Sequence, residues 1–222
     1  MKILGILGSP RENGNTSLLL DAVLDGAAKA GAQTQKIGVA GLELNFCIAC
    51  GKCHSTGKCF MEDGASMLQQ KMMAADGIVL ASPKYIGGIT AQLKTVLDRF
   101  SVGVHCFLLD GKYGASVTTA GGDALPGPAE YANQCLRGFG AQTVGIVAAQ
   151  ARGVGALVDQ ETVLAQAADL GRDLVAAIAQ KRQYPDQQQA HAVFFERMKN
   201  LVAFMGDHAP FQIEHWRKMG WL

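Results

Sequence analysis

The chain has 222 residues, of which 49% are hydrophobic and 18% charged, and its formal net charge is +1. This length suits one medium domain with a short appendage. The near-zero charge excludes a broad basic surface for nucleic acid or an anionic membrane. The first apolar run, Lys2–Leu7, is too short for an export signal, and no run approaches the roughly 20 apolar residues of a membrane span. We therefore expect a cytoplasmic protein with neither nucleic acid nor membrane as a partner.

Apolar runs alternate with helical patterns along the chain, which predicts an α/β fold with a parallel sheet covered on both faces. Five strands are expected, at residues 2–7, 34–37, 77–81, 113–119 and 142–149. Helices are expected from about residue 16 and at 64–75, 91–100, 129–139 and 162–180. Residues 1–182 should form one domain, and residues 183–222 a C-terminal helical extension. Such a doubly wound sheet binds ligands at the carboxyl ends of its strands.

A polar loop follows the first strand and opens directly into the first helix. Backbone N–H groups and the macrodipole at a helix N-terminus favour a bound phosphate. The side chains that can add donors are Ser9, Arg11, Asn15, Thr16 and Ser17. The loop lacks both the G-x-G-x-x-G spacing and the Gly-Lys-Ser/Thr ending, which disfavours dinucleotide and ATP sites. By itself it leaves open an ordinary helix-capping loop.

Two further loops end neighbouring strands at the same edge of the sheet, at residues 82–90 and 118–123. Both contain paired glycines. An isoalloxazine ring needs the close backbone approach that glycine permits, together with N–H donors for its carbonyls. The three loops together therefore indicate a site for FMN.

Three motifs carry a resemblance to a known family. They are Gly-Ser-Pro-Arg-x-x-Gly-Asn-Thr-Ser at 8–17, Ala-Asp-Gly-Ile at 75–78 with Ser-Pro-x-Tyr at 82–85, and Lys94 with Asp98-Arg99. Over about residues 1–150 the chain resembles flavodoxin-like proteins of the NADPH-dependent FMN reductase type. The resemblance implies a doubly wound five-stranded parallel sheet with the strand order 2-1-3-4-5. It also implies that the five loop side chains above hold the FMN phosphate.

The resemblance further implies which residues border the flavin ring. On one side these are Pro83, Lys84, Tyr85, Ile86 and Gly87, and on the other Thr119, Ala120, Gly121 and Gly122. Similar proteins usually carry a small or apolar residue where Lys84 stands. A cation there would favour the anionic reduced flavin and raise its potential.

Four of the six cysteines lie within thirteen residues, at Cys47, Cys50, Cys53 and Cys59. Their spacing lets a tight loop wrap one cubane, and thiolate sulfur is the usual ligand of [4Fe–4S] iron. Structural zinc more often uses two separated Cys-x2-Cys pairs. The spacing predicts a [4Fe–4S] cluster, and leaves zinc, a redox disulfide or inert thiols as alternatives. Nearby Lys52 and Lys58 would partly offset the negative charge of the cluster. Cys106 and Cys135 are expected to be structural thiols.

This cysteine motif in this fold resembles iron–sulfur flavoproteins, in which all four cysteines bind the cluster close to FMN. FMN carries one or two electrons and the cluster one, so their pairing suits an electron-transfer oxidoreductase. The expected donor is a ferredoxin-like protein or NAD(P)H, and the expected acceptor a small molecule such as a quinone or an oxygen species. No side-chain constellation indicates a separate catalytic residue.

Two alternatives remain at this point. One is an NAD(P)H-dependent FMN or quinone reductase without a cluster. The other is a non-catalytic, flavin-binding regulatory protein. The resemblance also implies a homodimer or homotetramer, although the aromatic tail is equally compatible with packing onto its own domain.

Overall fold

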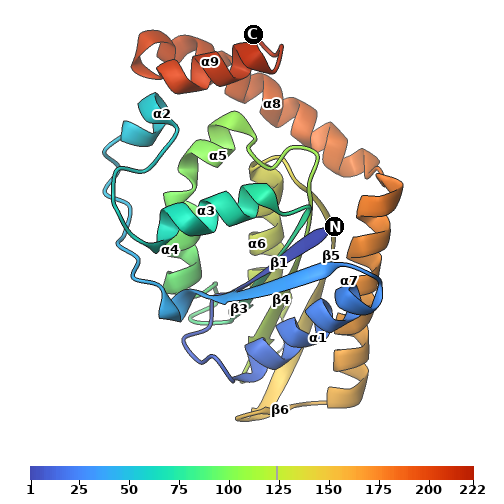
Figure 1. Ribbon diagram of the computed structural model, residues 1–222. Coiled ribbons are helices and arrows are strands. Elements are labelled where there is room, and N and C mark those ends of the chain that lie inside the picture. Colours follow the sequence, from blue (N-terminus) through green and yellow to red (C-terminus); the bar gives the residue numbers. More distant parts are fainter. Residues whose placement is uncertain (124) are drawn as a thin grey trace.

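The computed structural model describes residues 1–123 and 125–222. Over these residues the chain forms a six-stranded sheet with the order β2-β1-β3-β4-β5-β6, covered by helices (Figure 1). The strands are β1 Lys2–Leu7, β2 Gln33–Gly38, β3 Gly77–Pro83, β4 Tyr113–Ala120, β5 Gln142–Gly153 and β6 Ala156–Leu157. The helices are α1 Asn15–Lys29, α2 Lys52–Thr56, α3 Gly64–Ala74, α4 Ala91–Arg99, α5 Ser101–Cys106, α6 Gly127–Gly138, α7 Gln160–Gln180, α8 Pro185–Met205 and α9 Pro210–Lys218. Two 3-10 turns are η1 Val39–Gly41 and η2 Gly206–His208.

The sheet departs from the expected five strands at its β5 edge. The first five strands are parallel and stand in the expected order, but β6 pairs antiparallel with β5. β5 runs on to Gly153 instead of ending at residue 149, and Gly155, with φ of 73°, lies in the turn to β6. The prediction of five strands is therefore wrong. A strand of two residues is too short to leave a periodic pattern in the sequence.

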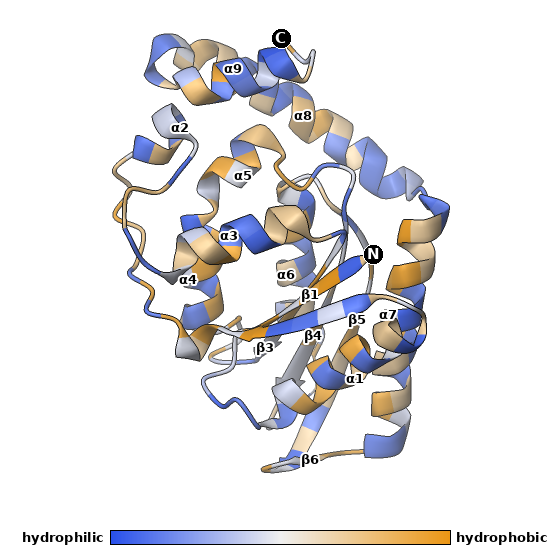
Figure 2. Ribbon diagram, viewed as in Figure 1, coloured by the Kyte–Doolittle hydropathy of each residue, from blue (hydrophilic) through white to orange (hydrophobic). Residues whose placement is uncertain are grey.

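Alternate strand residues face two separate cores, as the pleat requires. On β1, Ile3 and Leu7 pack with α1 and α7, whereas Leu4 and Ile6 pack with α3, α4 and α6. Polar and apolar residues alternate along α7, because only one side of this helix faces the sheet (Figure 2). α7 lies very close to α1: a Cβ atom on Gly171 would stand 1.9 Å from a carbonyl oxygen of α1. Glycine is therefore required at this crossing.

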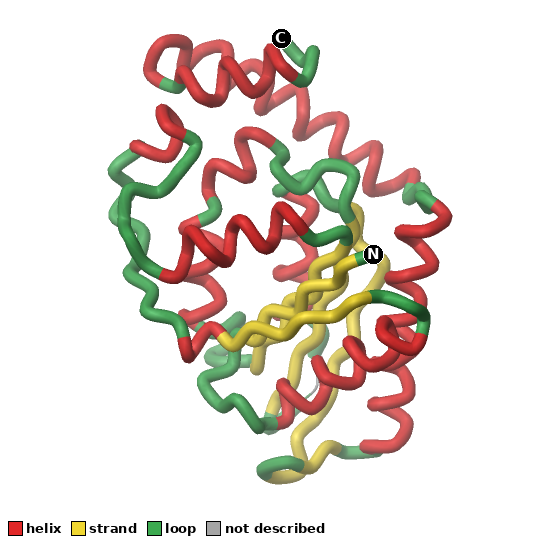
Figure 3. The backbone as a smooth tube through the Cα atoms, viewed as in Figure 1, coloured by secondary structure: helices red, strands yellow, loops and turns green. Residues whose placement is uncertain are grey.

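The segment between β2 and α3 is a long loop interrupted by the short helix α2 (Figure 3). It carries the four clustered cysteines, at the position in the topology that the sequence predicts. In Figure 1, α2 lies directly below α9, whereas β6 lies at the far end of the molecule. The cysteine loop and the β5–β6 turn are therefore well separated in one chain.

The C-terminal residues form α8, η2 and α9, which pack back onto the same chain. Their apolar cluster is built around Phe107, Met198 and Trp216. Trp216 is fully buried, and its Nε1–H donates to the His105 carbonyl oxygen at 2.7 Å. Phe204 stays 88% exposed. Within the described ranges, no helix combines the length and apolar character needed to cross a bilayer.

Candidate functional site

The loop after β1 places the first turn of α1 at the carboxyl edge of the sheet. α1 begins at Asn15, and its first turn, Asn-Thr-Ser-Leu, carries no charge. The first N–H groups of a helix have no intrahelical partner, so those of residues 15–17 can bind an anion. The Arg11 N–H donates to the buried Ser9 hydroxyl at 3.1 Å and fixes the loop that leads into the helix. This geometry can hold a phosphate.

Two side chains of α1 connect this turn to neighbouring strands. The hydroxyl oxygens of Thr16 and Thr119 lie 2.6 Å apart, and both residues are buried. One hydroxyl proton lies between the two oxygens, so the second proton is available to a ligand. The Asn15 side-chain amide donates to the Gly153 carbonyl at 2.7 Å and ties the β5–β6 turn to the loop. The buried Asn15 Oδ1 has no hydrogen-bond partner among the residues described.

These segments enclose a cavity of about 370 Å³, which is within the range of small-molecule sites. Its lining comes from three loops at the carboxyl edge of the sheet and from the end of β5. The lining residues are Ser9, Arg11, Gly14, Asn15, Thr16, Pro83, Lys84, Tyr85, Thr119, Ala120, Gly121, Ala151, Arg152, Gly153 and Val154.

Ten of the fourteen expected flavin-site residues line this cavity, and the other four lie beside it. The Ser17 hydroxyl accepts a hydrogen bond from Lys36 Nζ at 2.9 Å and donates one to Asp21 at 3.4 Å, which leaves only its backbone N–H for a ligand. Ile86 and Gly87 form the outer turn of their loop with φ of 47° and 81°, and Ile86 is fully exposed. Gly122 is exposed beyond the rim.

Sequence reasoning missed the contribution of β5 to this cavity. Arg152 lines it together with Arg11, so that two guanidinium groups are available to a phosphate. Because β5 was expected to end at residue 149, Arg152 fell outside the predicted site. The glycines on both sides of Val154 are the signal that could have revealed a turn here.

The loop after β3 is held by backbone hydrogen bonds. The Lys84 N–H donates to the Thr119 carbonyl at 2.7 Å, and Tyr85 and Gly88 exchange N–H to carbonyl bonds at 2.9 and 3.0 Å. At its far end, the Thr90 hydroxyl donates to the Gly8 carbonyl at 2.6 Å. The Lys84 side chain is half-buried at the cavity, and Tyr85 is 46% exposed at its edge. An aromatic ring is therefore presented where a planar ligand would enter.

A second cavity, of about 240 Å³, lies inside the cysteine loop. Cys47, Cys50, Cys53 and Cys59 all line it, and all four are free thiols. Burial raises the pKa of the Cys53 thiol, and the other three thiols raise it further because they lie close by. In the described part of the chain, no group of three or more His, Cys, Asp or Glu is arranged to hold a single metal ion. The four thiols therefore share the lining of one cavity.

A buried ion pair closes the base of the cysteine loop. Arg99 Nη1 and Nη2 donate to the two carboxylate oxygens of Asp63 at 2.6 and 2.9 Å, and Nη1 also donates to the Asn45 carbonyl at 2.7 Å. Burial acts to raise the pKa of Asp63, but the hydrogen bonds from Arg99, Asn45 and Ala65 outweigh it and lower that pKa to about 2. Asn45 precedes the cysteines and Asp63 follows them. Arg99 therefore joins both ends of the loop to α4.

The C-terminal helix α9 covers the outer side of the cysteine loop. The fully buried Gln212 bonds to His54 Nδ1 through its amide nitrogen and to His105 Nδ1 through its oxygen, the latter at 3.2 Å. Burial lowers the pKa of His54, and the nearby ring of His105, tilted by 31° and 4.8 Å away between centroids, lowers it further. At Gly57 a Cβ atom would stand 2.4 Å from the Phe211 ring. The sequence pattern gave no sign of this cover, because its partners lie more than 100 positions apart.

One helix links the two cavities. α4 is capped by Thr90, whose hydroxyl bonds to Gly8 beside the phosphate loop, and it ends at Arg99 beside the cysteines. Its nine residues correspond to a length of about 13 Å. The flavin cavity and the cysteine cavity are therefore positioned by opposite ends of the same element.

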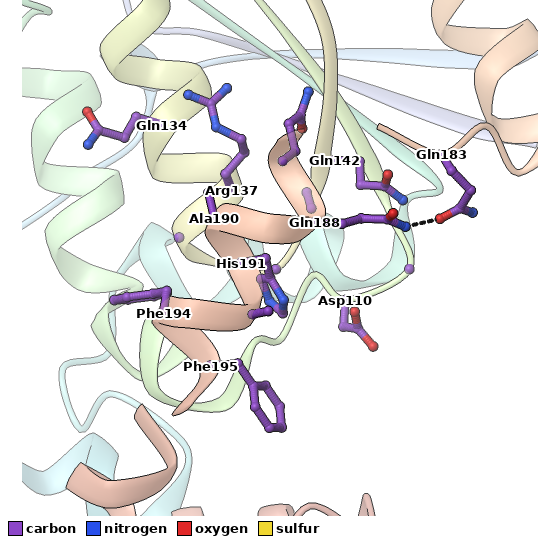
Figure 4. Close-up of a pocket in the computed structure, with 16 residues that line it drawn as sticks. Asp110, Gln134, Arg137, Gln142, Gln183, Gln188, Ala190, His191, Phe194 and Phe195 are labelled. Carbon is purple, nitrogen blue, oxygen red and sulfur yellow. Dashed lines mark hydrogen bonds between the residues drawn. The ribbon is translucent and has the colours of Figure 1, made fainter. Parts of the chain in front are cut away.

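A larger cavity, of about 890 Å³, lies between α6, α8 and the start of β5 (Figure 4). Arg137 and His191 line it together with several glutamine side chains. Arg137 Nη1 donates to the Thr143 hydroxyl at 2.8 Å, and burial lowers the pKa of Arg137. Among the described residues, its walls include none of those expected to bind flavin or cluster. The two smaller cavities therefore carry the predicted chemistry.

The fold and the first cavity together define an α/β protein of the flavodoxin-like class with a cavity at its strand ends. Comparison with known proteins supports this class. The family model described as NADPH-dependent FMN reductase matches residues 1–153. The chain belongs to this family.

Curated relatives include iron–sulfur flavoproteins. One from Archaeoglobus fulgidus is 32% identical over 224 aligned residues, which cover 100% of both chains. Another from Methanocaldococcus jannaschii is 45% identical over 117 residues, or 53% of this chain and 61% of that protein. Among solved structures, a flavone reductase has a TM-score of 0.65 at 23% identity, over 83% of this chain and 66% of the other. A flavodoxin from Archaea has a TM-score of 0.55 at 15% identity, over 81% of this chain and 99% of the other. The structural likenesses show the fold, and the family and relatives support a flavin-dependent electron-transfer oxidoreductase.

Proposed function

We propose that this protein uses both FMN and a [4Fe–4S] cluster to pass electrons from a ferredoxin-like protein or NAD(P)H to a small acceptor such as a quinone or an oxygen species. One observation carries the proposal. A single chain builds a phosphate-type cavity at its strand ends and a separate cavity lined by four free cysteines. The iron–sulfur flavoproteins among its relatives support the same pairing.

In this proposal the phosphate of FMN lies against the first turn of α1. Three groups supply donors there: the N–H groups of residues 15–17, the hydroxyls of Ser9 and Thr16, and the guanidinium groups of Arg11 and Arg152. The loops at residues 83–87 and 119–122 border the ring. When bound, FMN supplies one- or two-electron chemistry, so the protein's task is to bind, orient and electrostatically tune it.

The proposed ligands of the cluster are Cys47, Cys50, Cys53 and Cys59. They fit because they line one cavity whose base is closed by a buried cation. A [4Fe–4S] cluster there would supply one-electron transfer.

Anaerobic purification tests the pairing directly. We expect a brown protein with about four irons and one FMN per chain. Cys50→Ser should lose most of the iron and keep its FMN. Cys135→Ser is the matched control, since this half-buried thiol lies on α6 away from the cavity, and it should keep both. Iron-free, yellow wild-type protein would contradict the cluster.

A second candidate is an NAD(P)H-dependent FMN or quinone reductase without a cluster, and the family's own description favours it. Anaerobic reduction by ferredoxin, NADH and NADPH in parallel separates the two. Rapid oxidation of NADPH by iron-free protein would support the reductase. Fast reduction by ferredoxin that requires the four cysteines would support the electron-transfer protein.

We further propose that the protein works as a homodimer or homotetramer. The exposed side chains of Val193 and Phe204 on α8 offer apolar surface for such an assembly. Light scattering coupled to gel filtration measures the mass directly. A monomer at micromolar concentration would contradict this proposal.

A further inference from the structure

Arg99 is the buried cation of the cysteine cavity. Its side chain has no solvent exposure, and it lines the cavity together with the four thiols. Its pKa is raised, first by the hydrogen bond to Asp63 and then by the nearby Cys59. An arginine stays charged at this depth. Its partner Asp63 does not line the cavity, so the positive end of the ion pair lies at the cavity wall.

The hydrogen bonds of Arg99 use three of its five N–H donors. Both terminal nitrogens are used by Asp63 and Asn45 at the base of the loop. The buried Nε–H has no hydrogen-bond partner anywhere in residues 1–123 and 125–222. A buried donor without a partner is costly, unless a group that binds in the cavity satisfies it. The ion pair accordingly fixes the orientation of the guanidinium, and the Nε–H of this cavity-lining residue stays without a partner among the described residues.

The lysines of the loop do not provide a comparable charge. Lys52 is exposed, and its Nζ lies 4.5 Å from the centroid of the Phe60 ring. Lys58 is exposed as well. Water and salt screen such charges strongly, whereas a buried charge acts through a lower dielectric. Arg99 should therefore offset the negative charge of a bound cluster more strongly than Lys52 and Lys58, the residues expected from the sequence to do so.

We propose that Arg99 tunes the redox site in the cysteine cavity, by presenting its Nε–H and its charge to a sulfur of the bound [4Fe–4S] cluster beside Cys59 and so raising the reduction potential of that cluster. This inference rests on the proposed function, because it requires the cluster. When one electron arrives, the cavity gains one negative charge and no bond forms or breaks. A fixed positive charge and a hydrogen bond to sulfur both favour that state.

Arg99→Gln removes the charge and the Nε donor from the anaerobically purified holoprotein. We expect the ratio of reduced to oxidised cluster, at a fixed ambient potential, to fall at least tenfold. For a one-electron couple this is about 59 mV toward more negative potential. The measurement is a redox titration followed by electron paramagnetic resonance. The FMN potential, recorded in the same titration, should stay unchanged.

Three further variants separate tuning from folding. Lys52→Gln removes an exposed charge from the same loop, and it should change the ratio less than twofold. Arg99→Lys keeps the charge but loses the planar donor, and it should give an intermediate shift. Arg99→Gln combined with Asp63→Asn removes both buried charges, so that Asp63 is not left unpaired. It should still lower the potential, because the variant loses the unpartnered Nε–H of a residue that lines the cavity.

The outcomes are distinct. Variants that keep about four irons and the wild-type potential would overturn the proposal. If all three Arg99 variants keep FMN but lose iron, Arg99 only closes the loop, and the tuning role is refuted. Iron-free wild-type protein would instead refute the proposed function, which the iron analysis reveals before any variant is made.

Discussion

The hydroxyl pair of Thr16 and Thr119 allows a quantitative test of how the flavin cavity is built. The two oxygens lie 2.6 Å apart, and the residues are 2% and 4% exposed. Thr16→Val removes one partner and leaves the other hydroxyl buried without a bond. The expected loss is about 2 kcal/mol of unfolding free energy, since an unsatisfied buried group costs more than the bond itself contributes. Thr119→Val should cost a similar amount.

The double variant is the informative one. With both hydroxyls replaced by methyl groups, no buried donor is left unpaired, so the loss of unfolding free energy should fall well below the sum of the two single losses.

FMN affinity should respond differently. The pair holds one spare proton for the phosphate, so the double variant should bind FMN roughly tenfold more weakly or worse.

Urea denaturation of the flavin-free protein gives the stabilities, and quenching of FMN fluorescence gives the affinities. Ser17→Ala is the matched control, because its hydroxyl faces Lys36 and its backbone N–H is retained. It should change FMN affinity less than twofold. Additive stability losses would refute the pairing, and unchanged FMN affinity in the double variant would refute the phosphate contact.

Three other predictions follow from the structure. Asp63→Asn should cost about 2.5 kcal/mol at pH 7, because the folded state lowers the pKa of Asp63 from 3.8 to about 2, at about 1.4 kcal/mol per unit. This stabilisation is complete above about pH 5 and is lost as the pH falls through 3.8 toward 2. The difference in unfolding free energy between the wild type and Asp63→Asn, measured by urea denaturation, should therefore narrow below about pH 5. A constant difference would contradict the ion pair. Lys84→Ala should lower the FMN midpoint potential, by on the order of 30 mV in a two-electron titration, and an unchanged midpoint would show that Lys84 points away from the ring. Gln212→Ala removes the bridge from α9 to His54 and should speed the release of iron to a chelator several-fold; an unchanged rate would show that α9 does not hold the loop.

Much of the candidate site was open to prediction because its chemistry is contiguous in the chain. The phosphate loop reads as a strand, a polar turn and a helix start within residues 2–17, and the structure places Ser9, Arg11 and Thr16 around one cavity. Local hydrogen bonding and helix geometry decide such a segment almost alone. The grouping of the cysteines was predictable for the same reason, since a tight loop brings thiols that are three residues apart to the same side of the loop.

The sequence by itself determined the parallel order of five strands, the position of the cysteine loop and the residues of the α1 turn. Only the tertiary structure decided that β6 extends the sheet, that Arg152 joins the flavin cavity, and that Arg99 and Gln212 enclose the cysteines. Gln212 lies 158 positions from the residue it contacts, and Arg99 lies 36 from Asp63. Periodicity and motif spacing report the environment of neighbouring residues. Contacts of this range form only when separate elements pack, so no local pattern records them.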